Sequence, residues 1–268
     1  MQNFFFFIPE NFFLLLIVIS FSGFIRGFLG FGSGLITIPI LSFLYSPIFA
    51  IVFNIIIEIP TTIYLTFIGA KTCKFREIAP MFFSMMVTIP IGTFFLISIN
   101  EQIIKIFMSF LVIFFVILIA SGWRLKSKIT KYVLLISGIL SGLMQGITGM
   151  GGPPFATILL SKGDSDNITR GNILIMSTGI VISALFSMYY FSLFTNELLL
   201  TGIIASPFYI LASFSGAYFY NLSGSKYFRN ISLLVLGNIR YRGTIAPTSD
   251  DRFKHNEKNI INGLEIIR

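Results

Sequence analysis

The chain has 268 residues, of which 55% are hydrophobic and only 11% are charged. This composition excludes an ordinary water-soluble domain and predicts a polytopic membrane protein, because several separate apolar segments approach or exceed the roughly 20 residues that a spanning helix needs. The net charge of +8 does not indicate nucleic-acid binding, since the basic residues are spread over short loops, where they orient a membrane protein.

Apolar segments follow one another along the chain, and we expect all of them to be helical. They run over residues 12–31, 35–45, 48–70, 78–99 and 103–122 in the first half, and over 132–147, 154–160, 168–194 and 198–222 in the second. The predicted fold is therefore all-α, a polytopic transmembrane helical bundle.

Two of these segments end in a glycine-rich interruption. The first, residues 30–34, reads Gly-Phe-Gly-Ser-Gly, and the second, residues 149–153, reads Gly-Met-Gly-Gly-Pro. Glycines packed so densely end a helix, because they lose backbone entropy and tolerate dihedral angles that other residues avoid. In hydrocarbon, such a break survives only where protein or water covers its freed amides and carbonyls. The two breaks therefore predict one binding site inside the bundle.

Glycine spacing separates the breaks from ordinary helix packing. Glycines four residues apart are common where transmembrane helices approach closely, and this explanation suits Gly23 with Gly27 and Gly138 with Gly142. Glycines two residues apart face different sides of a helix, so at the two breaks we favour unwound backbone.

Loop charges orient the short pieces that follow the breaks. If each short piece completes a crossing and the N-terminus is outside, Lys105 alone among the loop cations falls outside. The cations then inside are Lys71, Lys74, Arg76, Arg124, Lys126, Lys128, Lys131, Lys162, Arg170, Lys226 and Arg229. If the short pieces instead returned to the side they came from, the last four would move outside, which the positive-inside rule disfavours. An odd number of crossings per half then inverts the second half in the membrane.

We accordingly divide the chain into four parts. Residues 1–123 form a first transmembrane repeat, 124–131 a basic cytoplasmic linker, and 132–238 a second transmembrane repeat. Its last helix is truncated, because polar residues cut off the apolar run that begins at Ile231. Residues 239–268 are expected to be a polar cytoplasmic tail.

Catalytic chemistry is not expected. The chain has one cysteine, Cys73, and one histidine, His255, so no cluster has metal-ligand spacing and no Cys/His pair suggests a nucleophile. Cys73 lies among Lys71, Lys74 and Arg76, where a solvated thiol is expected. We predict no enzymatic activity, no cofactor and no metal site.

Arg26 is the first candidate for substrate binding. It lies about one turn before the first break, and an arginine inside the membrane is costly and marks a functional site by default. Its planar guanidinium suits the oxygens of an oxyanion substrate. The alternative is that it snorkels to the cytoplasmic face.

Glu58 is the only acidic residue deep in an apolar segment, and Asn54 precedes it by one helical turn on the same face. A protonatable carboxylate here could couple proton movement to transport or hold Arg26 as its counter-ion. Alternatively, Glu58 is a protonated structural hydrogen-bond partner beside the Pro60 kink.

Other polar residues complete the predicted site. Asn172, near the start of a helix in the second half, is expected to line the cavity together with Asn54. Gln145, just before the second break, could donate to an anion, or alternatively bond between helices. The predicted substrate-binding residues are Arg26, Gly30, Gly32, Ser33, Gly34, Asn54, Gln145, Gly149, Gly151, Gly152 and Asn172, with Glu58 for coupling.

At these segments the sequence resembles the sulfite exporter TauE/SafE family of membrane transporters. The matching residues are Gly23 to Gly34 followed by Ile38-Pro39-Ile40, Ser46-Pro47 and Ala50, then Gly138, Gly142, Gly146, Gly149 to Pro153, Arg170-Gly171-Asn172, Gly216-Ala217 and Arg229. Ser33 stands where many members have another glycine. The resemblance covers roughly residues 11–236 and implies transport of small sulfur-containing anions, such as sulfite or sulfoacetate. It also implies a multi-pass protein of a bacterial or archaeal inner membrane.

The prediction is therefore a secondary transporter built from two inverted repeats, each with a glycine-broken helix, that works by alternating access. Its expected partners are a small anion and the lipid bilayer, without nucleic acid, and a homo-oligomer is left open. Two alternatives stay open: a passive anion channel, which would use the same cavity without coupling, and a structural membrane subunit, in which the breaks serve only packing.

Overall fold

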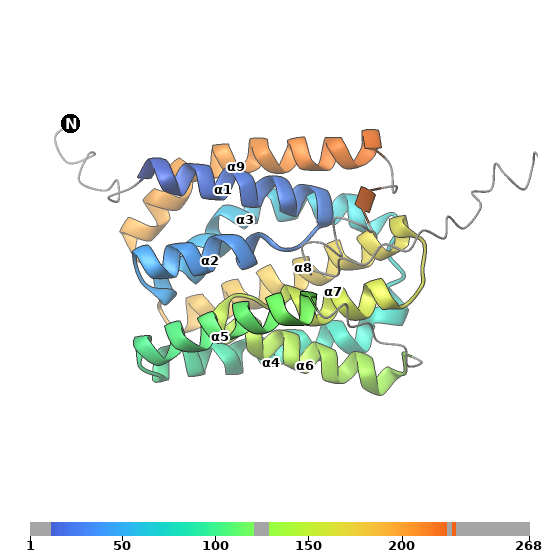
Figure 1. Ribbon diagram of the computed structural model, residues 1–268, viewed down its shortest axis with the longest axis horizontal. Coiled ribbons are helices and arrows are strands. Elements are labelled where there is room, and N and C mark those ends of the chain that lie inside the picture. The colour runs from blue at the N-terminus through green and yellow to red at the C-terminus, as the bar shows by residue number, and fades with distance from the viewer. Residues whose placement is uncertain (1–11, 121–128, 224–226, 229–268) are drawn as a thin grey trace, which may run out of the picture.

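The computed structural model describes residues 12–120, 129–223 and 227–228 (Figure 1). The elements within these ranges are all helices, which confirms the all-α prediction. They are α1 (Phe12–Leu29), α2 (Ser33–Leu44), α3 (Pro47–Ala70), α4 (Phe75–Ser98), α5 (Glu101–Ala120), α6 (Lys131–Thr148), α7 (Gly152–Ser161), α8 (Asp166–Tyr190) and α9 (Asn196–Ser223). Most of the basic linker, the truncated last helix and the polar tail lie outside the described residues.

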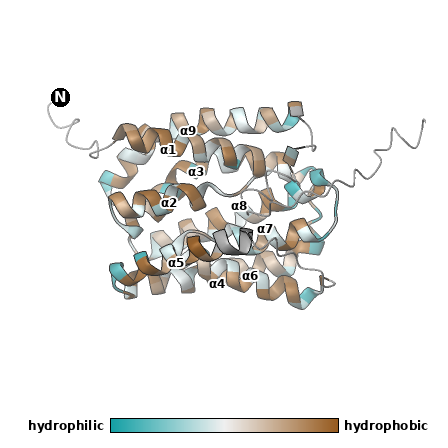
Figure 2. Cartoon of the chain, viewed as in Figure 1, coloured by the Kyte–Doolittle hydropathy of each residue, from teal (hydrophilic) through white to brown (hydrophobic). Residues whose placement is uncertain are grey.

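The exterior of the bundle suits hydrocarbon rather than water. Within the described ranges, six helices are long and apolar enough to cross a membrane, namely α1, α3, α4, α6, α8 and α9. Large apolar side chains such as Phe43, Phe67 and Leu211 are exposed along the helices, while the hydrophilic residues gather at the two ends of the bundle (Figure 2). A soluble monomer rarely exposes such a surface. The chain is a multi-pass membrane protein.

Small residues let two helix pairs approach to backbone contact. Gly138 and Gly142 on α6 pack against Met81 and Met85 on α4, and the positions advance together, so the two helices are parallel. Gly23 and Gly27 pack in the same way against Tyr209 and Ser213, which makes α1 parallel to α9. The close-packing role predicted for the glycines four residues apart is therefore confirmed.

The centre of the bundle is formed by α3 and α8. These helices run antiparallel, because Thr66 on α3 bonds to Thr178 on α8 at 2.7 Å while Thr72 lies against Gly171. On their outer sides α3 contacts α9 and α8 contacts α4. The contacts therefore give the order α1, α9, α3, α8, α4 and α6 across the bundle. The short helices α2 and α7 lie towards the middle of the bundle (Figure 1).

The loops between α3 and α4 and between α7 and α8 meet at one end of the bundle. Lys162 on one loop pairs with Glu77 at the start of α4, and Lys74 lies 3.4 Å from Asp164. Burial of Lys162 opposes its charge, but its hydrogen bonds to Glu77 and Asp164 hold the pKa of this lysine above its usual value. Lys105 lies at the opposite end, 2.8 Å from Glu101.

The close pairing of α4 with α6 predicts a cost for any side chain at Gly146. A Cβ there would overlap the backbone of Ile89 and Thr93, and overpacking of this kind costs about 1–3 kcal/mol. We expect Gly146→Ala to lower the midpoint of thermal unfolding in detergent. Gly163→Asn is the control, because no atom lies within 4 Å of a Cβ at Gly163 and asparagine tolerates its positive φ of 81°. Equal midpoints for the two variants would contradict this packing.

Candidate functional site

Both glycine segments leave the helical conformation, as predicted. After α1, Gly30 and Gly32 adopt φ values of 89° and 97°, and α2 restarts at Ser33. After α6, Gly149 has φ of 70° and ends the helix in the left-handed conformation, and α7 begins at Gly152. Residues with a Cβ rarely adopt these angles, so the sequence itself imposes the breaks.

The two breaks lie against each other inside the bundle. A Cβ on Gly34 would come within 2.6 Å of the carbonyl oxygen of Gly149, and one on Gly152 would lie 3.4 Å from the ring of Phe31. Glycine is therefore required at position 34 for close approach. Segments more than a hundred residues apart in sequence form one unit here.

A cavity of about 350 Å³, including its opening, lies between the breaks and the neighbouring faces of α3 and α8. Its lining consists of Arg26, Phe31, Gly32, Ser33, Gly34, Leu35, Asn54, Glu58, Gln145, Gly149, Met150, Gly152, Phe155, Ser177 and Ile180.

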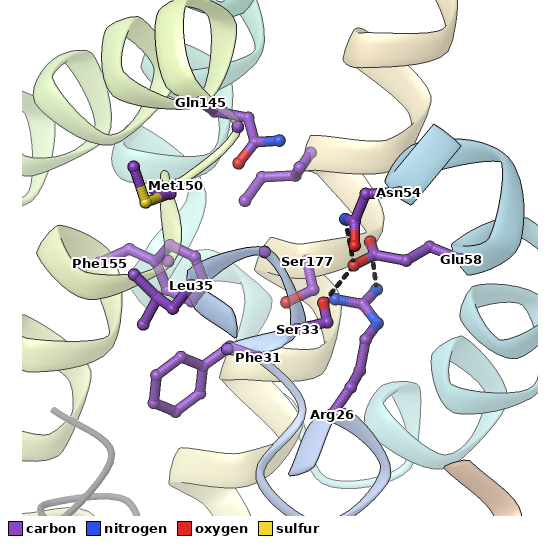
Figure 3. Close-up of a pocket in the computed structure, with 15 residues that line it drawn as sticks. Arg26, Phe31, Ser33, Leu35, Asn54, Glu58, Gln145, Met150, Phe155 and Ser177 are labelled. Carbon is purple, nitrogen blue, oxygen red and sulfur yellow. Dashed lines mark hydrogen bonds and ion pairs between the residues drawn. The ribbon is translucent and has the colours of Figure 1, made fainter. Parts of the chain in front are cut away.

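One wall of the cavity is charged. Arg26 Nη2 lies 3.4 Å from Glu58 Oε2 and donates a hydrogen bond to Thr62 Oγ1 at 2.9 Å. Oε1 of Glu58 accepts hydrogen bonds from Asn54 Nδ2 at 2.9 Å and from Ser33 Oγ (Figure 3). The Arg26 and Glu58 side chains are only 5% and 4% exposed. Glu58 is therefore the counter-ion of Arg26, and the alternative that Arg26 snorkels to a membrane face is wrong.

Two polar atoms of this wall have no hydrogen-bond partner among the described residues. They are Arg26 Nε, a donor, and Asn54 Oδ1, an acceptor, and both are buried. A buried polar group left unpaired costs about 1–3 kcal/mol, so such groups are uncommon unless they serve a bound molecule. The free donor on a guanidinium that lines a cavity suits an anion.

The opposite wall is apolar. Phe31, Leu35, Met150 and Phe155 face the charged cluster across the cavity, and Gln145 projects towards it from α6 (Figure 3). These four apolar residues were not among the predicted binding residues, and neither were Ser177 and Ile180 of α8. Phe31 and Met150 lie within the breaks themselves, which was the one signal that could have found them.

Residues of α8 satisfy the carbonyl end of α1. Arg170 donates from Nε to the carbonyl of Phe28 at 3.0 Å and from Nη2 to that of Gly27 at 2.7 Å, and Ser177 Oγ donates to the carbonyl of Gly30 at 2.7 Å. The guanidinium of Arg170 also lies 3.9 Å from the ring centroid of Tyr220. The negative end of α1 is thus compensated by a buried cation.

The amino ends of the two short helices are left open. The N-cap residues of α2 and α7 are Gly32 and Gly151, and neither helix has a side-chain cap. Residues in the first turn of α2 and the first residue of α7 line the cavity. The positive ends of two helix dipoles are therefore directed at the same space.

Three predicted binding residues lie outside the cavity lining. Gly30 and Gly151 support the breaks through their carbonyls, which accept hydrogen bonds from Ser177 and Ser141. Asn172 accepts a hydrogen bond from the backbone N–H of Lys74 at 2.9 Å, at the basic end of the bundle. The expectation that Asn172 lines the cavity with Asn54 is wrong, because α8 begins at that end rather than beside the break.

Cys73 was expected to be a solvated thiol and is half-buried instead. Burial raises its pKa to about 11, against an opposing influence of Lys162, so the thiol stays protonated at neutral pH. Among the residues that the structure describes, no group of three His, Cys, Asp or Glu side chains could hold a metal ion.

Arg170→Met is expected to destabilise the fold, because the carbonyls of Gly27 and Phe28 would lose their donors inside the bundle. Hydrogen bonds to charged groups contribute about 1.5–3 kcal/mol each, so the unfolding midpoint in detergent should fall by several degrees. The unfolding midpoint of Arg170→Lys should lie between those of the parent and Arg170→Met, since lysine keeps the charge without the planar fork. An Arg170→Met variant as stable as the parent would contradict this role of Arg170 at the carbonyl end of α1.

The comparison with known families agrees with this geometry. Residues 15–239 match the family described as "Sulfite exporter TauE/SafE", a range that includes both breaks, Arg26, Glu58 and Arg170. Comparisons with curated proteins and with solved structures return no match. The match spans far more than half of the chain, and the protein therefore belongs to the sulfite exporter TauE/SafE family of membrane transporters.

Proposed function

We propose that the protein is a secondary transporter that carries a small anion, a sulfur oxyanion or an organosulfonate, through the cavity between the two breaks. The family supports transport of a sulfur compound. The observation that carries the proposal is the meeting of two uncapped helix amino ends and a buried arginine at one cavity.

The electrostatics of the cavity favour an anion. The amino end of α2 carries about half a positive charge, and α7 adds to it although Pro153 and Pro154 in its first turn have no N–H to donate. The carbonyl end of α1, in contrast, is already compensated by Arg170. Arg26 adds a fork of donors suited to several oxygens on one atom, and its Nε has no acceptor. A sulfur oxyanion presents that arrangement of oxygens.

The two unlike walls favour a substrate with a charged head and a small carbon part. Arg26 and the α2 amino end would hold the sulfonate oxygens, and Phe31, Met150 and Phe155 would contact the carbon atoms. Inorganic sulfite fills only the polar side, so we place organosulfonates first within this class.

Helix directions support two inverted repeats. If the two halves are repeats, α1 corresponds to α6, α3 to α8 and α4 to α9. The parallel pair of α1 and α9 then corresponds to the parallel pair of α6 and α4. The central α3 and α8 pair is antiparallel, as a two-fold axis in the membrane plane requires. Alternating access between such units is the mechanism we propose, with the basic end of the bundle in the cytoplasm.

Counterflow in liposomes tests the function. We expect internal unlabelled sulfoacetate to accelerate uptake of labelled sulfoacetate by the reconstituted protein, because a carrier exchanges substrate across the membrane. Anion conductance without such exchange would indicate the channel alternative. Neither exchange nor conductance would indicate a structural subunit and would overturn the proposal.

The role of Arg26 is tested by a variant that keeps the pair neutral. Removing Arg26 alone would leave Glu58 buried without its counter-ion, which typically costs about 3–5 kcal/mol, so the useful change is Arg26→Gln combined with Glu58→Gln. This double variant should bind sulfoacetate about 10- to 100-fold more weakly than Glu58→Gln alone, in keeping with the loss of a charge-assisted hydrogen bond. Equal affinities, with both variants folded, would exclude Arg26 from the binding site.

A further inference from the structure

We infer, building on the proposed function, that the anion and the Glu58 carboxylate are alternative partners of Arg26, so that each monovalent anion crosses the membrane together with one proton. Glu58 then does more than balance a buried charge. It makes anion binding conditional on protonation.

The charge of the site imposes this exchange. As described, Arg26 and Glu58 form a neutral pair that is nearly excluded from solvent. An anion entering beside the intact pair would leave one uncompensated negative charge in a medium of low dielectric constant, which is strongly unfavourable. Protonation of Glu58 leaves one net positive charge on Arg26, and the anion then restores neutrality.

The atoms are arranged for the exchange. Oε1 of Glu58 holds the hydrogen bonds from Asn54 and Ser33, whereas Oε2 faces Arg26 Nη2 at 3.4 Å. A proton that binds Oε2 forms an O–H bond there and removes the negative charge that holds the guanidinium. Arg26 keeps its hydrogen bond to Thr62 and turns its free donors, including Nε, to the anion oxygens.

Few other ionisable groups share this environment. From α1, Arg26 is the one cation within ion-pair distance of Glu58 among the described residues. From α9, the buried Tyr209 lies within electrostatic reach of both Arg26 and Glu58 and close to Ser33 of α2. On α3 itself the neighbour is the neutral Asn54. Glu58 is therefore the carboxylate that Arg26 balances in this part of the cavity.

Binding measured against pH tests the inference. Methanesulfonate is the probe, because it stays a monoanion throughout the range and any pH dependence belongs to the protein. For the full-length protein we expect the affinity to rise up to tenfold per pH unit on acidification, since one proton is taken up with each anion. Glu58→Gln should bind methanesulfonate equally at every pH, with the affinity that the parent shows at low pH.

Glu77→Gln is the matched control, because this carboxylate lies at the basic end of the bundle, outside the cavity, and its loss should leave the pH profile of the parent unchanged. A Glu58→Gln variant that retained the pH dependence of the parent would overturn the inference and leave anion transport standing. No binding by the parent at any pH would overturn the proposed function itself.

A second measurement needs no variant. Adding methanesulfonate to the parent protein in weakly buffered detergent solution should raise the pH of the solution. The size of this rise should correspond to one proton taken up for each anion bound. In liposomes, the same stoichiometry makes uptake of a monoanion responsive to a pH gradient and insensitive to membrane potential. Anion binding without proton uptake would contradict the exchange directly.

Discussion

Backbone that leaves the helical conformation inside a bilayer must find hydrogen-bond partners within the protein, and this constraint shapes the whole molecule. The carbonyls freed at the end of α1 are held by Arg170 and Ser177 of α8, and the second break is held by Gln145 and Ser141 of α6. Part of the support for the first break thus comes from the second half of the chain. The cavity exists because the two halves complete each other.

The negative and positive helix ends at the breaks have different surroundings. Carbonyl ends are satisfied by a buried arginine and by hydroxyl groups, while the amino ends of α2 and α7 remain without side-chain caps beside the cavity. Arg26 adds a full positive charge to the same space and is neutralised by Glu58. The helix amino ends favour an anion, but in the proposed exchange Glu58 competes with it for Arg26, which limits the affinity and suits a transporter that must also release its substrate.

Much of the fold could be predicted because hydrophobic segments and glycine clusters report directly on helices and their ends. The Arg26 and Glu58 pair could also be predicted, since charged residues within apolar segments are easily recognised in a sequence. The directions of Phe31 and Met150 could not be predicted, because unwound backbone has no periodicity. The roles of Arg170 and Ser177 could not be predicted either, since their hydrogen-bond partners are backbone carbonyls, which every residue carries. Asn172 was misplaced because the distance from the second break to α8 depends on the length of α7.

The glycine contacts between α4 and α6 and between α1 and α9 bring backbone against backbone, with no flexible side chain between them to yield. Each pair joins a helix from one half of the chain to a helix from the other half. These two pairs therefore tie the two halves of the chain together on both outer sides of the bundle, while the central pair of α3 and α8 is joined by threonine hydroxyls and by the close approach of Gly69 and Gly171. A movement that separated the two halves as rigid bodies would therefore have to break backbone contact in both pairs.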